Sequence, residues 1–117
     1  LVHVLKILKK YSREKYLKAL EKNILEISDL GLEKFIKELN DKKSLNTVEN
    51  AFIQKMKINE NAYGLLLIME AIKLLNNKRA FEKGFEVLKS RKEDFKKFPI
   101  WEEDLENYLK ENNLKID

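Results

Sequence analysis

AYGLLLIMEAIKLL, residues 62 to 75, is the stretch of this sequence that decides the fold. Its apolar residues point in nearly every direction of a helix, and the only interruptions are Tyr63, Gly64, Glu70 and Lys73. Because such a helix has no wet face, neighbouring helices must surround it. The sequence therefore predicts a buried central helix at about residues 60–76 that the rest of the chain encloses.

Composition extends this expectation to the whole chain of 117 residues. Gly (3) and Pro (1) are scarce, whereas Leu, Lys and Glu, which favour helices, are abundant. No alternation of apolar and polar residues persists long enough to indicate a sheet. We therefore predict an all-α fold with a single domain, residues 1–117. Its architecture is expected to be a compact bundle or a short stack of about six to seven antiparallel helices around the central helix.

Particular residues mark the expected helix ends. Gly31 suits the left-handed position just past a helix. Asn46 begins a segment with the form of a capping box, and Asn59 is expected to cap the central helix. Residues 79–97 are expected to form one helix. Pro99 is expected to begin the last helix, where its missing amide does no harm.

Two glycines, Gly64 and Gly84, stand inside expected helices. Each costs about 1 kcal/mol of helix stability relative to alanine. We therefore expect helix backbones to approach each other closely at both positions.

Residues that could carry catalysis are few and scattered. Cysteine is absent and His3 is the only histidine, which leaves no pair of soft or imidazole ligands for a metal. The absence of a Glu-x-x-His motif excludes the carboxylate-bridged di-iron bundle. The acidic segment 102–106 is interpreted as charge at a helix start, because adjacent residues of a helix point in different directions. We predict that the chain is not an enzyme and uses no cofactor or metal.

The first functional hypothesis is a noncatalytic protein interaction domain, acting as an adaptor or as a subunit of a larger assembly. Apolar residues cover more of the first expected helix than one buried face requires. Aromatic residues of the last helix form a second candidate, because such residues dominate interface energetics. The residues expected to contact another protein, or a second copy of this chain, are Val2, Val4, Ile7, Trp101 and Tyr108.

Lysine patches favour an alternative, a small basic subunit that contacts nucleic-acid phosphates without reading sequence. The formal net charge is +4, with a basic excess over residues 1–97 and an acidic excess after them. Lysine greatly outnumbers arginine, however, and arginine clamps phosphates and reads bases better. The residues of this alternative are Lys6, Lys9, Lys10, Arg13, Lys89, Lys92 and Lys96.

The segment 27–32 resembles the turn of a DNA-binding helix-turn-helix through its helix end, its glycine and the apolar residue that follows. Lys37 stands, however, where that motif has a buried apolar residue, and Ile27 is larger than the residue usual before the turn. The sequence therefore does not favour this motif.

The longest apolar run is far shorter than the roughly 20 residues that cross a bilayer, so we expect no membrane span. The sequence begins with Leu1 instead of Met, so a targeting segment could precede it. Localisation stays open, with the cytoplasm as the default expectation.

Overall fold

The computed structural model describes residues 1–116, and within that range the chain forms helices and no strand. The all-α prediction is confirmed. The α-helices are, in chain order, α1 (Val2–Tyr11), α2 (Arg13–Glu26), α3 (Leu32–Leu39), α4 (Lys42–Thr47), α5 (Glu49–Ile58), α6 (Ala62–Lys73), α7 (Lys78–Ser90) and α8 (Pro99–Glu111). Two 3₁₀ helices, η1 (Asp29–Gly31) and η2 (Lys92–Lys97), precede α3 and α8.

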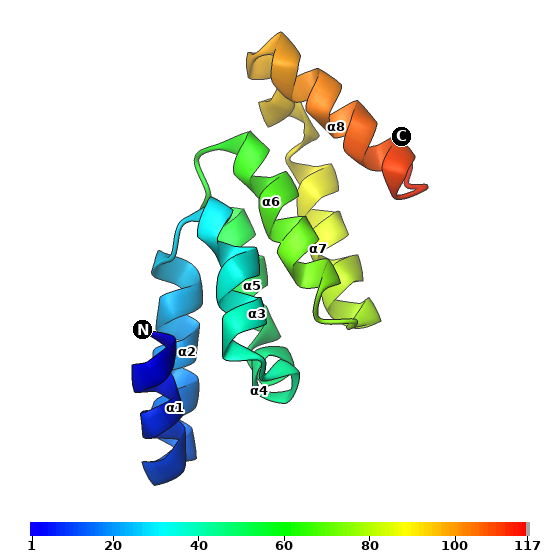
Figure 1. Ribbon diagram of the computed structural model, residues 1–117. Coiled ribbons are helices and arrows are strands. Elements are labelled where there is room, and N and C mark those ends of the chain that lie inside the picture. Colours follow the sequence, from blue (N-terminus) through cyan, green and yellow to red (C-terminus); the bar gives the residue numbers. More distant parts are fainter. Residues whose placement is uncertain (117) are drawn as a thin grey trace.

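The longer helices lie in two layers that run in opposite directions (Figure 1). In the first layer α1 packs on α3, α3 on α6 and α6 on α8; in the second, α2 packs on α5 and α5 on α7. Lys9 at the end of α1 contacts Asp41 just after α3, and Lys73 at the end of α6 contacts Asn112 just after α8. The helices of the first layer therefore run parallel to one another. The molecule measures 47 × 24 × 20 Å.

α6 is covered from several directions. It contacts α3 and η1 on one side, α8 and η2 on the other, and α5 and α7 behind it. Its most deeply buried side chains are Leu65, Ile68, Met69, Ala71 and Ile72. The helix is shorter than the predicted 60–76, because residues 74–76 continue as a turn.

Three expected helix ends differ in the structure. Gly31 has φ −86° and a right-handed conformation, because η1 leads directly into α3. Asn61, not Asn59, caps α6, and its side-chain oxygen accepts the Tyr63 amide at 3.0 Å. The expected helix 79–97 is divided at Arg91 into α7 and η2. Pro99 does begin α8, as predicted.

Asn46 lies inside α4 and does not cap a helix. Its side-chain amide donates to the Leu75 carbonyl at 3.3 Å, and its side-chain oxygen accepts from Asn77 Nδ2 at 3.0 Å. Asn46, whose sequence context is that of a helix cap, therefore joins α4 to the connection between α6 and α7.

Both helical glycines lie under side chains and not under another backbone. A Cβ on Gly84 would lie 2.8 Å from Met69 Sδ and 3.2 Å from Ile72 Cδ1, so α7 packs closely on side chains of α6. A Cβ on Gly64 would overlap with Asp29 Oδ2. The expected close approach of two helix backbones is therefore wrong for both positions, because the atoms nearest to each glycine belong to side chains.

None of the helices in the described residues combines the length and the hydrophobicity needed to cross a lipid bilayer.

Candidate interaction surfaces

An apolar stripe on α1 faces solvent at one end of the molecule. Val4, Ile7 and Tyr11 follow the spacing of one helix face, and they are 62%, 45% and 84% exposed. Leu1, just before the helix, is also exposed, whereas Leu5 points into the core and is 2% exposed. We call Leu1, Val4, Ile7 and Tyr11 the α1 stripe. Val2, which the sequence also nominates, is partly buried against the core.

The place of α1 in its layer explains the stripe. α3 and α6 each have a neighbour on both sides within the layer, whereas α1 has a neighbour, α3, on one side only (Figure 1). α2 packs against it from the other layer. One apolar face of α1 is therefore covered by the described chain and the other is not.

The charged side chains of α1 itself are all positive, since the helix carries no acidic residue; the glutamates nearest in the fold belong to α2 and α3, which pack on it. Lys6 and Lys10 are exposed, and neither forms an ion pair within residues 1–116. Lys9 Nζ instead lies 2.7 Å from Asp41 Oδ2, and Arg13 donates to a serine of α4 at 3.5 Å. Of these four predicted phosphate contacts, two fasten the first helix pair to the rest of the fold and two remain available to a partner.

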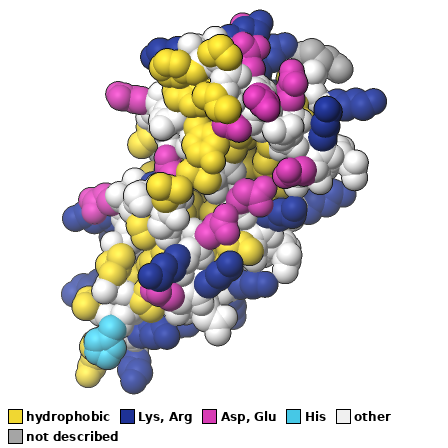
Figure 2. All heavy atoms as spheres, turned by 45° about the horizontal axis from the view of Figure 1, so that its top comes forward, with side chains coloured by type: hydrophobic (Ala, Val, Ile, Leu, Met, Phe, Trp, Pro, Cys, Tyr) yellow, Lys and Arg dark blue, Asp and Glu magenta, His cyan; other side chains and the backbone are white. Residues whose placement is uncertain are grey.

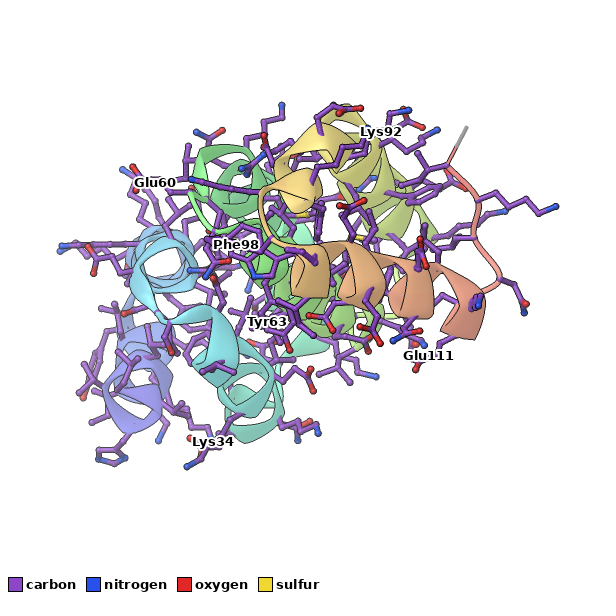
Figure 3. The ribbon with its side chains drawn as sticks, turned by 90° about the horizontal axis from the view of Figure 1, so that it is seen from above. Lys34, Glu60, Tyr63, Lys92, Phe98 and Glu111 are labelled. Atoms are coloured by element: carbon purple, nitrogen blue, oxygen red, sulfur yellow. The ribbon has the colours of Figure 1, made fainter. Side chains whose placement is uncertain are left out.

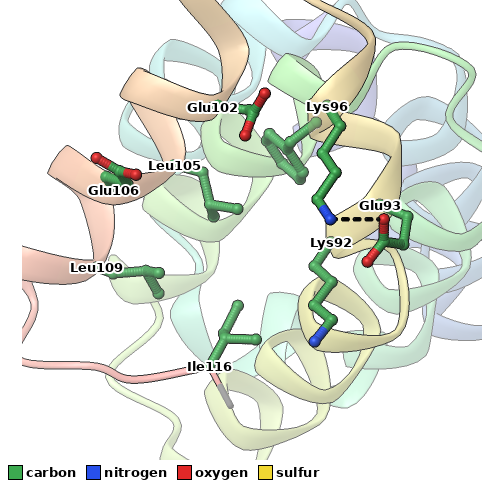
Figure 4. Close-up of a pocket in the computed structure, with 9 residues that line it drawn as sticks. Lys92, Glu93, Lys96, Glu102, Leu105, Glu106, Leu109 and Ile116 are labelled. Carbon is green, nitrogen blue, oxygen red and sulfur yellow. Dashed lines mark ion pairs between the residues drawn. The ribbon is translucent and has the colours of Figure 1, made fainter. Parts of the chain in front are cut away.

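The remaining lysines of the nucleic-acid alternative lie at the other end of the molecule, on α7 and η2. Lys92 and Lys96 line a cavity of about 220 Å³ between η2 and α8, with Phe95 buried behind it (Figure 4). Lys96 pairs with Glu93 at 3.0 Å, and Lys89 pairs with a glutamate of its own helix at 2.8 Å. The structure therefore does not join these lysines and those of α1 into one basic strip.

The two aromatic candidates of α8 have different surroundings. Trp101 is partly exposed, and its ring meets Phe98 edge to face with centroids 4.5 Å apart. Tyr108 is 5% exposed, and its hydroxyl has no hydrogen-bond partner among the described residues. Burial, and then the charge of Glu70, raise the pKa of Tyr108. Its ring packs in the core and leaves little surface for a partner. The role of Tyr108 as an anchor for a partner stays a prediction.

A second apolar surface, which sequence reasoning missed, lies where α3, α6 and α8 begin. It is formed by Leu30, Tyr63, Phe98 and Ile100, which are 81%, 38%, 47% and 58% exposed; we call these residues the edge patch. Leu30 and Tyr63 also line a cavity of about 270 Å³. Each of these helix starts carries a large apolar residue, just before the helix or in its first turn, but nothing in the sequence shows that these residues share one surface.

The edge patch is bordered by acidic side chains. Figure 2 shows an apolar strip with acidic groups along its borders, and Figure 3 shows Tyr63 and Phe98 near the middle of the same edge. The acidic residues in the segments that contribute the patch are Asp29, Glu60, Glu102 and Glu103. Lys97, directly before Phe98, is a basic residue of the same segments. Asp29 is already engaged by Lys55 and Asn59, so the negative excess at this edge rests on Glu60, Glu102 and Glu103.

A polar network beneath Leu30 holds this edge in place. Lys55 is 5% exposed, and its Nζ donates to the carbonyls of Leu25 at 3.2 Å and Ile27 at 2.5 Å. Asp29 Oδ1 lies 3.9 Å from the same ammonium, and Asp29 Oδ2 accepts from Asn59 Nδ2 at 2.8 Å. Burial lowers the pKa of Lys55, and the charge of Asp29 raises it. These contacts fix the end of α2 against α5.

Within residues 1–116, no group of three or more His, Cys, Asp or Glu side chains is placed to hold a metal ion. Comparison of the chain with protein-family models, with curated proteins and with solved structures finds no match.

Proposed function

We propose that this protein is a noncatalytic interaction domain, an adaptor or subunit that docks onto another protein through the α1 stripe. The observation that carries the proposal is the pair of apolar faces on α1. Leu5 is buried on one face, whereas Val4 and Ile7 are exposed on the other. Covering exposed apolar surface is favourable by about 25 cal/mol per Å², so a partner that covers the stripe gains affinity.

The charges beside the stripe define the chemistry of that partner. Lys6 and Lys10 are exposed, and α1 has no acidic residue to balance them. A partner helix with its own apolar stripe and flanking Asp or Glu would bury apolar area and pair these lysines. We therefore propose that the partner offers an apolar surface bordered by acidic side chains, of which an acidic amphipathic helix is the simplest form.

The same proposal assigns a role to the fold. We propose that the chain works as a short stack of helix pairs centred on α6, in which each first-layer helix rests on the next one. α1 is the end of this stack, and it offers a partner the kind of face that α3 offers to α6. The contacts of α6 with both layers support this arrangement.

Two synthetic helical peptides test the proposal. Both carry the same leucine stripe, flanked by glutamate in one peptide and by lysine in the other, and binding is followed by fluorescence anisotropy. We expect micromolar binding of the glutamate peptide and at least about tenfold weaker binding of the lysine peptide, a difference of about 1.4 kcal/mol. Equal binding of the two peptides would contradict the proposed partner chemistry.

A matched pair of variants locates the binding surface. Ile7 and Ile58 are 45% and 58% exposed, and Ile58 lies at the end of α5, outside the α1 stripe. We expect Ile7→Glu to abolish binding of the glutamate peptide and Ile58→Glu to leave it unchanged. Binding that survives Ile7→Glu would place the docking surface elsewhere.

One observation favours the nucleic-acid alternative, namely that Lys6 and Lys10 are exposed and form no ion pair among the described residues. These two lysines could contact phosphates without reading sequence. Lys89 and Lys96 are already paired with glutamates, which weakens their attraction for a polyanion. We therefore place protein docking first.

A further inference from the structure

The two exposed apolar surfaces of this chain are complementary in charge. The α1 stripe is flanked by lysines and carries no acidic residue, whereas the edge patch is bordered by acidic residues (Figure 2). Opposite charges around the two apolar surfaces favour contact between them. Contact between two stripes, or between two patches, would bring like charges together and is therefore opposed.

We infer that the partner of the α1 stripe is a second copy of this chain, whose edge patch receives α1. This inference rests on the proposed function of α1 and names the occupant of that face. Val4 and Ile7 of one copy would lie against Tyr63, Phe98 and Ile100 of the other, which buries the exposed apolar area of both surfaces. Lys6 and Lys10 would lie near the acidic residues that border the patch.

One molecule cannot make this contact with itself. α1 is held in its layer by Leu5, which is 2% exposed, and by the Lys9–Asp41 ion pair at 2.7 Å. The edge patch begins at η1 and extends to α8, while the side chains of the stripe are exposed on α1, at the far end of the layer from α8 (Figure 1). The two surfaces can therefore meet only between separate copies.

The contact joins two different surfaces, so each copy keeps one stripe and one patch after it has bound a neighbour. Such a heterologous interface forms open chains of molecules unless its rotation closes a ring. A dimer that paired two α1 helices would bring their lysines together, and one that paired two edge patches would bring their carboxylates together, so charge opposes both. Charge thus selects head-to-tail association.

Three exposed isoleucines provide a matched set of variants for the test. Ile7 belongs to the α1 stripe and Ile100 to the edge patch, while Ile58 belongs to neither; their exposures are 45%, 58% and 58%. Each is replaced by glutamate, and circular dichroism confirms that each variant is folded. Sedimentation velocity then measures the mass of each protein as a function of concentration.

We expect the mass of the unaltered chain and of Ile58→Glu to rise with concentration beyond that of a dimer. Ile7→Glu alone and Ile100→Glu alone should stay monomeric, because each lacks one of the two surfaces. Their equimolar mixture should form a dimer and nothing larger, since the intact patch of one variant accepts the intact stripe of the other. A mixture that associates in this way also shows that both variants are folded.

Three results would overturn the inference. The unaltered chain could remain monomeric up to about millimolar concentration, where even weak contacts are populated. Either single variant could associate as the unaltered chain does, or the mixture could stay monomeric. If the glutamate peptide still binds α1 in those cases, the proposed function stands and only the identity of the partner is wrong.

Discussion

The Tyr16 hydroxyl donates a hydrogen bond to Asp41 Oδ2 at 2.8 Å and so joins the start of α2 to the cap of α4. The same carboxylate accepts from Lys9 Nζ at 2.7 Å and from the Ser44 amide at 3.2 Å. Burial alone would raise the pKa of Asp41, but the hydrogen bonds from Lys9, Ser44 and Tyr16 outweigh it and hold the pKa well below its usual range. One carboxylate thus fastens the helix pair that carries the α1 stripe.

Replacing Asp41 by asparagine keeps its size and removes its charge. Because the folded pKa lies below the unfolded value of about 3.9, the carboxylate contributes stability above that pH and loses it as the pH falls. We expect Asp41→Asn to lower the free energy of unfolding by about 1–3 kcal/mol at pH 7. Urea denaturation should show this gap shrinking below about pH 4. An equal difference in stability between the unaltered protein and Asp41→Asn at pH 7 and below about pH 4 would contradict the role of the charge.

Two buried tyrosines provide a matched comparison, because one hydroxyl has a partner and the other has none among the described residues. Tyr16 is 1% exposed and bonds to Asp41, whereas Tyr108 is 5% exposed and its hydroxyl is unpaired. We expect Tyr16→Phe to destabilise the fold by about 1–3 kcal/mol, and Tyr108→Phe to leave stability unchanged or to raise it. Thermal and urea denaturation of both variants measure the difference. Equal losses in the two variants would show that the hydroxyl contacts do not matter.

Alkaline titration tests the same contact. Burial, and then the hydrogen bond to Asp41, raise the pKa of Tyr16 to about 12. Because the pKa of Tyr16 is higher in the folded than in the unfolded protein, its protonated hydroxyl contributes to the free energy of unfolding. This contribution is fully present below the unfolded value of about 10 and is lost as the pH rises toward 12. We expect the tyrosinate absorbance of Tyr16, obtained as the difference from Tyr16→Phe, to appear only near pH 12. Ionisation of Tyr16 near pH 10 in the folded protein would contradict its burial.

Lys55 lies on the same helix as a matched control, Lys57. Lys55 is buried and donates to two carbonyls at the end of α2, whereas Lys57 is exposed. Lys55→Met would leave those carbonyls without their donor, so we expect a loss of about 1.5–3 kcal/mol in the free energy of unfolding. Lys57→Met should change it by less than about 0.5 kcal/mol. Similar effects of the two variants would show that Lys55 acts only through its aliphatic chain.

The parts of the fold that could be predicted from the sequence are those fixed by local pattern. The apolar window 62–75 identifies α6, and Pro99 identifies the start of α8. Helix ends chosen by distant contacts could not be predicted in this way. Asn46 has the pattern of a cap, but its side chain bonds to residues of a connection that is far away in the sequence. Arg91 similarly donates to the Met56 carbonyl at 2.8 Å, at the point where the expected helix 79–97 is divided.

The same distinction applies to the surfaces. Val4 and Ile7 could be nominated because their helical spacing is visible in one short segment. The edge patch could not be nominated, because its residues come from three separate segments. The fold brings Leu30 beside Tyr63 in one cavity lining, and Tyr63 and Phe98 to the same edge. A surface assembled from separate connections leaves no periodic signal in a sequence.

The effect of alanine at Gly64 depends on a side chain from another element. Alanine favours a helix by about 1 kcal/mol over glycine, but its Cβ at this position would overlap with Asp29 Oδ2 and would lie 2.8 Å from Asn59 Nδ2. Asp29 is held there by Asn59 at 2.8 Å. We expect Gly64→Ala to destabilise the protein, and to do so less when Asp29 is also alanine, because Asn59 then loses its hydrogen bond to Asp29 and can move aside. Urea denaturation of the four proteins measures this coupling, and additive effects would show that Asp29 moves aside freely.

Salt dependence distinguishes docking onto protein from binding to nucleic acid. Each phosphate contact contributes about −0.9 to the slope of log K against log salt on duplex DNA. With only Lys6 and Lys10 available, we expect weak binding of labelled DNA, a slope near about −2, and little binding at about 200 mM salt. Fluorescence anisotropy measures it, with Lys6→Glu/Lys10→Glu compared against Lys15→Glu/Lys22→Glu, which makes the same charge change on α2. If all seven nominated residues contacted phosphates, the slope would instead be near about −6. A slope of that size, together with loss of DNA binding in the α1 variant but not in the α2 variant, would favour nucleic acid as the partner.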